Sequence, residues 1–416
     1  MNQNTNNQSN SAMWLIGILF FIFGFVTWLN GPLITFVKYA FHLDTDAKAF
    51  WVTTAFYMAY FFLALPSASI LRLTGMKKGM AIGLIVMAIG TFLFGSYATA
   101  RNYTWSLIGL FVIGAGLSVL QTASNPYISI LGPIETASRR ISIMGIANKI
   151  AGILSPIILS VVAFKGIENL DERMANANPN EQELILTEFA SQVYIPYMVM
   201  AIILIALAIW VWFSSLPEIK SDTVNKSEES AKDKKLKDFP HLWLGACALF
   251  LYVGVEVIAG DAIGIYGQGF GIPAGQTTYF TSFTLGGMLI GYLIGIATIP
   301  KYMSQEQSLK YSAYLGIIFT ILAFLTKGYV SIVFVALLGL ANALMWPAIF
   351  PMAIRGLGKW TELGSAILIM GIAGGAILPK IFAYGKEYFD FQWVFLFVMI
   401  PAYIYILYYA TKGYKK

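Results

Sequence analysis

Twelve long apolar stretches, separated by short loops and one charged segment near the middle, constrain this chain more than any other feature. Apolar residues make up 58% of the 416 residues and charged residues only 12%. About 20 apolar helical residues cross a bilayer core roughly 30 Å thick, and a soluble protein could not cover this much apolar surface. The pattern predicts an all-α, polytopic membrane protein. The expected transmembrane helices are 13–41, 48–73, 77–98, 103–131, 139–164, 192–216, 240–268, 276–300, 307–326, 328–355, 361–384 and 390–411.

The basic residues lie mainly in alternate loops and in the charged central segment, for example at Lys77–Lys78 and Arg139–Arg140. Basic residues favour the cytoplasmic side of a membrane. We therefore expect a multi-pass protein of the bacterial inner membrane, a cell membrane, with both termini in the cytoplasm. The net charge of +6 follows from the same bias and does not indicate nucleic acid. The expected partners are the lipid bilayer and a small-molecule substrate, bound by a monomer.

The charged segment divides the chain into two sets of six spans. The expected parts are a disordered tail at 1–12, an N-terminal six-helix bundle at 13–216, a cytoplasmic linker at 217–239, a C-terminal six-helix bundle at 240–411 and a cytoplasmic tail at 412–416. The first part lacks the basic region and cleavage site of a signal peptide. A second hydrophilic region, Lys165–Ser191, is acidic and should cap the exterior.

A short internal repeat supports this division. The sequence IMGIA occurs at Ile143–Ala147 in the fifth span and at Ile369–Ala373 in the eleventh, which are matching positions in a duplicated six-helix unit. The halves should form pseudo-symmetric bundles, an arrangement in which transporters place a site between the halves near the bilayer midplane. A proline follows each copy of the repeat, at Pro156 and Pro379. Prolines also interrupt the spans before the repeats, at Pro126 and Pro133 in the fourth span and at Pro347 and Pro351 in the tenth.

Three ionisable side chains lie deep inside predicted spans: Lys149 in the fifth, and Glu256 and Asp261 in the seventh. A charge at the bilayer centre costs about 2.5–3.5 kcal/mol on insertion scales, so such residues usually face a cavity or a partner. We expect roles in substrate binding or coupling, with a structural ion pair as the alternative. The single cysteine, Cys247, excludes an intramolecular disulfide and a Cys-based metal site. No nucleophile with a base is visible, so an enzyme is not expected.

Neutral polar and aromatic residues occur on the same spans at helical spacings. The pairs that share a face by i, i+4 spacing are Gln121 with Asn125, Tyr252 with Glu256, and Asn342 with Trp346. The candidate substrate-binding residues are Gln121, Asn125, Asn148, Lys149, Tyr252, Glu256, Asn342 and Trp346, and the coupling or cation candidates are Asn30, Lys149, Glu256 and Asp261. Gly31-Pro32 should weaken the first helix, because proline lacks the N–H donor. The glycines from Gly260 onward should bend or break the seventh.

The chemistry of these candidates indicates the ligand. Amides offer paired donors and acceptors, while Trp and Tyr combine an apolar face with a polar edge. This mixture suits a neutral polyhydroxylated ring, so a sugar is the favoured ligand. Amino acids, nucleosides and lipophilic compounds are the alternatives. No cofactor is expected apart from a transported Na+ or H+.

Four motifs extend over much of the chain. They are GLSVLQTASNPYISILGP (Gly116–Pro133) followed by RRISIMGIANKIAG, YVGVE (Tyr252–Glu256), WPAIFPMAIRGLG (Trp346–Gly358) and GSAILIMGIAGG (Gly364–Gly375). They resemble the fucose/glucose/galactose permease branch of the major facilitator superfamily, and the resemblance covers nearly all twelve spans. It implies two six-helix bundles that rock about a central site and import a monosaccharide together with a cation.

Two positions depart from the proton-coupled members of that branch. Those members carry an acidic residue in the first span after LN and another in the fourth before TA-NP. This chain has Gly31 and Gln121 there, and neither can carry a proton. Sodium coupling, uniport, and proton coupling through an exchange between Lys149 and a carboxylate all stay open. An exporter of other small molecules on the same fold is the further alternative.

Overall fold

The computed structural model describes residues 3–130, 137–164, 166–214, 216, 235–299 and 301–415. All regular elements within these ranges are helices, and twelve helical segments in them are long and apolar enough to cross a bilayer. The prediction of an all-α protein with twelve spans is confirmed. Most of the expected linker (217–234), Pro133 and Lys165 lie outside the described residues.

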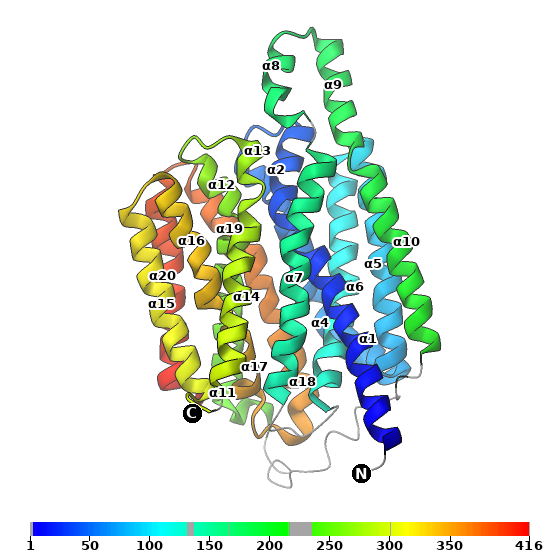
Figure 1. The fold of residues 1–416 in the computed structure, drawn as a ribbon, viewed down its shortest axis with the longest axis vertical. Coiled ribbons are helices and arrows are strands. Elements are labelled where there is room, and N and C mark those ends of the chain that lie inside the picture. The colour runs from blue at the N-terminus through cyan, green and yellow to red at the C-terminus, as the bar shows by residue number, and fades with distance from the viewer. Residues whose placement is uncertain are drawn as a thin grey trace.

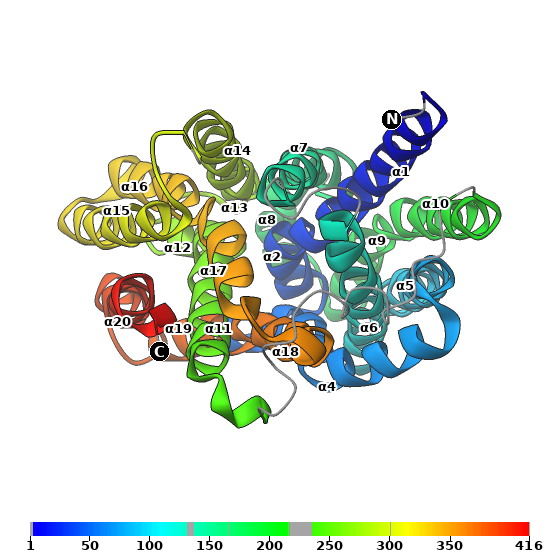
Figure 2. The ribbon, with the colours of Figure 1, turned by 90° about the horizontal axis from the view of Figure 1, so that it is seen from below.

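The first six spans occupy one side of the molecule and the last six the other (Figures 1 and 2). The helices of the first half are α1 (Gln3–Trp28), α2 (Asn30–Ala40), α3 (Asp46–Ala49), α4 (Trp51–Thr74), α5 (Met76–Thr99), α6 (Tyr103–Ile130), α7 (Ala137–Ala163), α8 (Leu170–Ala175), α9 (Pro179–Ser191) and α10 (Tyr194–Phe213). The helices of the second half are α11 (Pro240–Gly260), α12 (Ile263–Gln268), α13 (Ala274–Thr277), α14 (Phe280–Thr298), α15 (Gln305–Leu325), α16 (Gly328–Asn342), α17 (Met345–Ile354), α18 (Thr361–Met370), α19 (Gly374–Gly385) and α20 (Phe391–Thr411). Short 3₁₀ turns include η7 (Gly371–Ala373), which joins α18 to α19.

The N-terminal segment differs from the expected disordered tail, because helix α1 begins at Gln3 and not at Met13. Extending an existing helix costs far less free energy than nucleating one. The apolar span from Met13 onward therefore supplies the nucleus from which the helix continues into the polar residues before it.

Several spans are broken where glycine and proline weaken the helix. The first span breaks at Leu29, between α1 and α2, just before Gly31-Pro32 as predicted. The seventh breaks after Gly260, also as predicted. The fourth span differs, because α6 runs through Pro126 to Ile130 without interruption. Membrane helices tolerate proline where neighbouring groups satisfy the carbonyl that it leaves free.

The two halves meet chiefly through α7 and α4 of the first half. Helix α7 packs against α14, and α4 packs against α18, η7 and α19, as the view from below shows (Figure 2). Because α7 carries the candidates Asn148 and Lys149, its contact with α14 holds this part of the candidate site on the seam between the halves.

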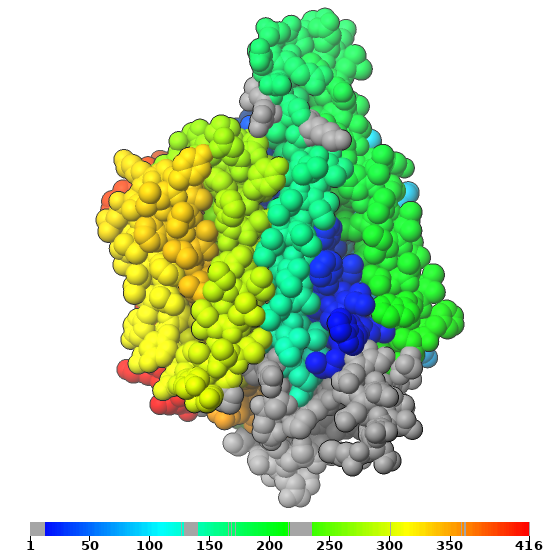
Figure 3. Space-filling model, in the orientation of Figure 1, coloured from blue at the N-terminus to red at the C-terminus, as the bar shows by residue number. Residues whose placement is uncertain are grey.

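The outward faces of the bundle are apolar, and one end carries an extra helical hairpin. Large apolar side chains such as Ile202, Phe213 and Phe397 are exposed, as expected for helices that face lipid. Helices α8 and α9 project beyond the spans (Figure 3), and a capping box between Asn178 and Glu181 begins α9. We refer to this end as the α8–α9 end and to the other, where both termini lie (Figure 1), as the terminal end.

Candidate substrate site

A cavity of about 120 Å³ lies on the seam between the halves. One water molecule needs roughly 10–15 Å³ of such space, so the cavity has room for several waters or a small solute. Helices α1, α4, α6 and α7 of the first half line it, together with α11, α14, α17 and η7 of the second. The predicted substrate-binding residues in the lining are Gln121, Asn125, Asn148, Lys149, Tyr252, Glu256 and Trp346.

Helix α6 supplies an amide face to the cavity. The Gln121 amide donates to the Tyr60 hydroxyl over 3.0 Å, and the Asn125 amide donates to the Gln121 carbonyl oxygen over 3.0 Å. Both side chains line the cavity because four residues of helix return to the same face. Gln121 and Tyr60, joined by this hydrogen bond, both line the cavity.

Helix α7 supplies a third amide, that of Asn148. The Trp28 indole donates to Asn148 Oδ1, and Asn148 Nδ2 donates to the Phe20 carbonyl oxygen, both over 3.4 Å. Hydrogen bonds of this length lie beyond the usual 2.7–3.2 Å range and are weak. A ligand with hydroxyl groups can therefore compete for the Asn148 amide at little cost.

An ion pair joins the two halves inside the cavity. Lys149 Nζ lies 3.1 Å from Glu256 Oε1, and the two side chains are only 7% and 11% exposed. The Lys149 ammonium also lies 4.2 Å from the centroid of the Trp28 ring, a cation–π distance. The structural ion pair that the sequence left as an alternative is present, yet both of its members line the cavity.

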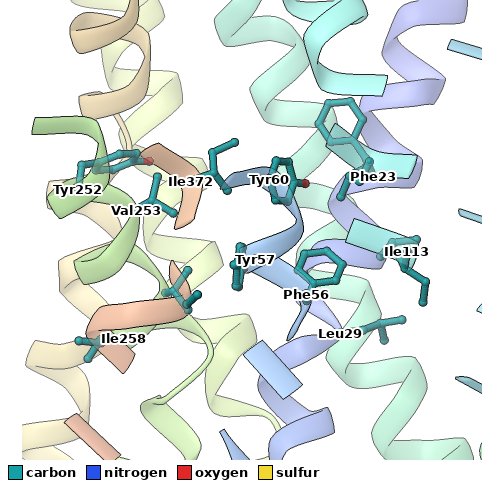
Figure 4. Close-up of a cluster of buried hydrophobic side chains, with 14 of the residues drawn as sticks. Phe23, Leu29, Phe56, Tyr57, Tyr60, Ile113, Tyr252, Val253, Ile258 and Ile372 are labelled. Carbon is teal, nitrogen blue, oxygen red and sulfur yellow. The ribbon is translucent and has the colours of Figure 1, made fainter. Parts of the chain in front are cut away.

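Several aromatic residues of the lining were not predicted. Tyr57 and Tyr60 of α4, Tyr292 of α14 and Trp28 of α1 line the cavity. Tyr252 on α11 and Tyr60 on α4 lie on either side of Ile372 (Figure 4). The available signal was the pair of tyrosine hydroxyls three residues apart in the middle of the second span, because a buried hydroxyl needs a partner.

Asn342 does not line the cavity. It is fully buried, and its Oδ1 accepts a hydrogen bond of 2.9 Å from the Tyr403 hydroxyl of α20. The i, i+4 spacing predicted a common face with Trp346, but α16 ends at Asn342 and α17 begins only at Met345. The break between these helices turns the two side chains toward different neighbours, so the shared-face prediction was wrong.

The remaining coupling candidates lie behind the cavity wall. Asn30 is buried and donates to the Thr27 carbonyl oxygen over 3.0 Å. Asp261 is 1% exposed and directly follows α11. Among the residues that the structure describes, no group of three or more His, Cys, Asp or Glu side chains could hold a metal ion.

The halves are joined by charged groups at the α8–α9 end. The Asp46 carboxylate lies 2.6 Å from Lys38 Nζ of its own half and 2.5 Å from Lys386 Nζ of the other. The Ala47 backbone N–H donates to Glu387 Oε1 over 3.1 Å, and Lys380 Nζ donates to the Ala47 carbonyl oxygen. In contrast, the cavity lining reaches toward the terminal end through Phe20 and Ile141, which precede Trp28 in α1 and Asn148 in α7.

Comparison with known proteins identifies the family. The model of the Major Facilitator Superfamily matches residues 16–379. A glucose/galactose transporter of Brucella abortus is 32% identical over 99% of this chain and 96% of its own length. An L-fucose-proton symporter of Escherichia coli is 27% identical over 90% of this chain and 86% of its own length. A crystal structure of the transporter FucP in its outward conformation superposes with a TM-score of 0.77, at 24% identity, over 97% of this chain and 98% of that one. The chain therefore belongs to the Major Facilitator Superfamily and is a transporter, not an enzyme.

Proposed function

We propose that this protein is a secondary active transporter that imports a neutral hexose-like sugar together with a cation. The observation that carries the proposal is the cavity on the seam between the halves. One wall presents the amides of Gln121, Asn125 and Asn148. The facing wall presents Tyr252 and aromatic neighbours. Transporters with two repeated halves bind their substrates between those halves.

A sugar fits this lining chemically. Each hydroxyl of a hexose both donates and accepts, as an amide does. The apolar face of the ring can pack on Trp346 or Tyr252, whose rings combine an apolar face with a polar edge. Glu256 accepts and Lys149 donates, so both can bind hydroxyl groups without requiring a charged substrate.

The names of the relatives support the same substrate class. The Brucella abortus relative is called a glucose/galactose transporter, and the Escherichia coli relative an L-fucose-proton symporter. Glucose, galactose and fucose are hexose or deoxyhexose rings of similar size. The second name also supports a proton, rather than sodium, as the coupling ion.

The arrangement of contacts supports alternating access with the terminal end inside. Basic residues in the loops favour a cytoplasmic terminal end, in the inner membrane of a bacterium. The Asp46–Lys386 ion pair then closes the exterior side, and the cavity lining extends toward the cytoplasm. In the opposite state this pair separates, and the cavity takes up sugar from outside.

Sugar counterflow in proteoliposomes tests the proposal. Liposomes loaded with unlabelled glucose, galactose or fucose should accumulate the labelled sugar transiently, and the matching sugar should also raise the melting temperature. A ligand at a hundredfold its Kd stabilises a protein by about 2.7 kcal/mol. Energised dye efflux without counterflow of any hexose would instead favour the exporter.

A pair of matched asparagines tests the site itself. Asn148→Ala removes an amide of the cavity wall and should raise the KM for sugar about tenfold, the effect of losing about 1.4 kcal/mol of binding. Asn342→Ala removes a buried amide that faces Tyr403 instead and should leave KM unchanged while lowering the melting temperature. Equal effects of the two changes on KM would contradict the assignment of the cavity.

A further inference from the structure

Asp261 occupies an unusual place on the seam between the halves. It follows the last residue of α11, and its backbone N–H still donates to the Val257 carbonyl oxygen over 2.7 Å. At this helix end, Thr281 of α14 donates its hydroxyl to the Gly260 carbonyl oxygen over 2.8 Å. Asp261 is only 1% exposed and is not among the residues that line the sugar cavity.

The two oxygens of this carboxyl group have different surroundings. Oδ2 accepts a hydrogen bond of 3.3 Å from the Tyr57 hydroxyl of α4. Oδ1 is buried and makes no hydrogen bond of normal geometry within the described part of the chain, although the Gly31 backbone N–H interacts with the carboxyl group. Gly31 of α2 lies against it: a methyl group there would be 3.3 Å from Oδ1 and 2.4 Å from Thr281 Oγ1. The absence of a side chain at position 31 leaves the space that Thr281 and Asp261 fill.

The charged and titratable groups that face Asp261 come from three helices. They are Tyr57 of α4, Lys149 of α7 and Glu256 of α11, whereas α2 and α14 present the neutral Gly31 and Thr281. Lys149 Nζ is already 3.1 Å from Glu256 Oε1. The only cation of this group therefore compensates Glu256, and the second carboxyl group has no counter-ion of its own.

Charge balance then singles out Asp261. With both carboxylates ionised, Lys149, Glu256 and Asp261 together carry one negative charge on a buried seam. An uncompensated charge inside a membrane is costly, and so is a buried acceptor with no donor. A proton on Oδ1 removes the first cost, because it makes the carboxyl group neutral, and a neutral carboxyl group is cheaper to bury than a carboxylate.

We propose that Asp261 is the residue that binds the proton carried with the sugar, an inference that rests on the proposed function as a sugar importer. While the α8–α9 end is open, water reaches the carboxylate and a proton from that side bonds to Oδ1. The neutral network can then close as the structure shows it. Opening of the terminal end lets the O–H bond break, and the proton passes to water on the cytoplasmic side.

Uptake driven by a pH gradient tests this role. In proteoliposomes with a more acidic exterior, the wild type should concentrate glucose or galactose, up to about tenfold per pH unit for one proton per sugar. Asp261→Asn should still exchange labelled for unlabelled sugar, yet the sugar concentration inside the proteoliposomes should rise only to the external concentration. Asp44→Asn is the matched control, because the Asp44 side chain is 67% exposed, and it should concentrate sugar as the wild type does.

The possible failures are distinguishable. No hexose counterflow by the wild type would overturn the proposed function. Concentration driven by sodium and not by pH, or undiminished concentration by Asp261→Asn, would overturn the assignment of the proton to Asp261 while leaving sugar transport intact.

A measurement on the wild type covers the case in which Asp261→Asn does not fold. Hydrophobic carbodiimides modify protonated carboxyl groups in apolar surroundings. Peptide mass spectrometry should find the label on Asp261, several-fold more at acidic than at alkaline pH. Label on Glu256 with none on Asp261 would assign the proton to the cavity wall and overturn the proposal.

Discussion

Helices α1 and α7 of the first half pack closely, and so do the corresponding helices α11 and α19 of the second. The glycine at the contact lies on the first helix of the pair, α1, in the first half and on the second helix of the pair, α19, in the second half. A Cβ on Gly24 of α1 would lie 2.3 Å from the Asn148 carbonyl oxygen of α7. A Cβ on Gly374 of α19 would lie 1.8 Å from the Phe250 carbonyl oxygen of α11. The numbering offset that aligns the two IMGIA repeats also aligns Gly24 with Phe250 and Asn148 with Gly374.

The same exchange occurs one turn further along. In the first half the large Trp28 of α1 meets Gly152 of α7, and in the second half Gly254 of α11 meets the large Leu378 of α19. The same offset aligns these pairs. A close helix crossing thus needs one small residue at each contact, and either helix can supply it.

This exchange explains why the two halves give the cavity different chemistry. Because α1 supplies the glycine in the first half, α7 is free to carry Asn148 and Lys149 after its IMGIA repeat. In the second half the repeat is followed by Gly374 and Gly375, and the charged residue is Glu256 on α11. An approximately symmetric scaffold thereby places a cation and an anion on opposite walls.

The largest expected effect comes from separating these charges. Lys149→Met or Glu256→Gln alone leaves one buried charge without its partner, which typically costs about 3–5 kcal/mol of stability. The double change removes both charges and should cost clearly less than the sum of the two. Thermal unfolding of the purified protein measures this, and Lys48→Gln is the control, because its exposed pair with Asp44 is worth at most about 1 kcal/mol. Additive single effects would show that the pair is not coupled.

The next largest effect on stability is expected from the glycines at these helix contacts. Gly24→Ala and Gly374→Ala each place a methyl group against a backbone oxygen, which a flexible side chain cannot relieve, so we expect a loss of about 1–3 kcal/mol or more. Gly286 of α14 has nothing within 4 Å of such a methyl group, and Gly286→Ala should leave the melting temperature unchanged or slightly raised. Equal melting temperatures for the three variants would refute the exchange of glycines between the halves.

A smaller effect is expected at the contact between Trp28 and Gly152. Gly152→Ala places a methyl group 2.6 Å from Trp28 Cδ1, and Trp28→Phe weakens the cation–π contact with Lys149, worth up to about 2 kcal/mol when desolvated. The smaller ring makes room for the methyl group, so the double variant should melt above the value expected from adding the single losses. A double-mutant cycle of melting free energies checks this.

The fold was accessible from the sequence because its determinants are local. The length of each apolar run gave the twelve spans, and the backbone chemistry of Gly31-Pro32 and of the glycines from Gly260 gave two helix breaks. The start of α1 at Gln3 was missed because helix propagation depends on the neighbouring span and not on the polar residues themselves.

The site was only partly accessible, because side-chain direction depends on helix continuity and on partners far along the chain. Gln121 and Asn125 share a face since α6 is continuous, whereas the break after Asn342 separates that residue from Trp346. The hydroxyls of Tyr57 and Tyr60 were a signal for buried partners, but their spacing alone does not show that they line a cavity. The ion pair between Asp46 and Lys386 joins residues from the two ends of the sequence and could not be inferred from spacing.

The smallest expected effect concerns the Asp46 carboxylate at the α8–α9 end, which has one lysine partner in each half. Asp46 binds Lys38 of its own half and Lys386 of the other. Lys386→Gln weakens closure directly, and a partly exposed ion pair is worth up to about 1 kcal/mol, which corresponds to a shift of about fivefold in the ratio of closed to open molecules.

Spin labels at positions 44 and 388, both on exposed side chains, report that ratio as a distance distribution, with Cys247 replaced to remove the native thiol. Lys386→Gln should increase the long-distance population. Lys38→Gln is the matched control, because it leaves Asp46 free to bind Lys386 more strongly and should keep or reduce that population. If the two variants open the α8–α9 end equally, the carboxylate acts only as a local charge within its own half, and closure depends on the packing of α4 against α18 and α19.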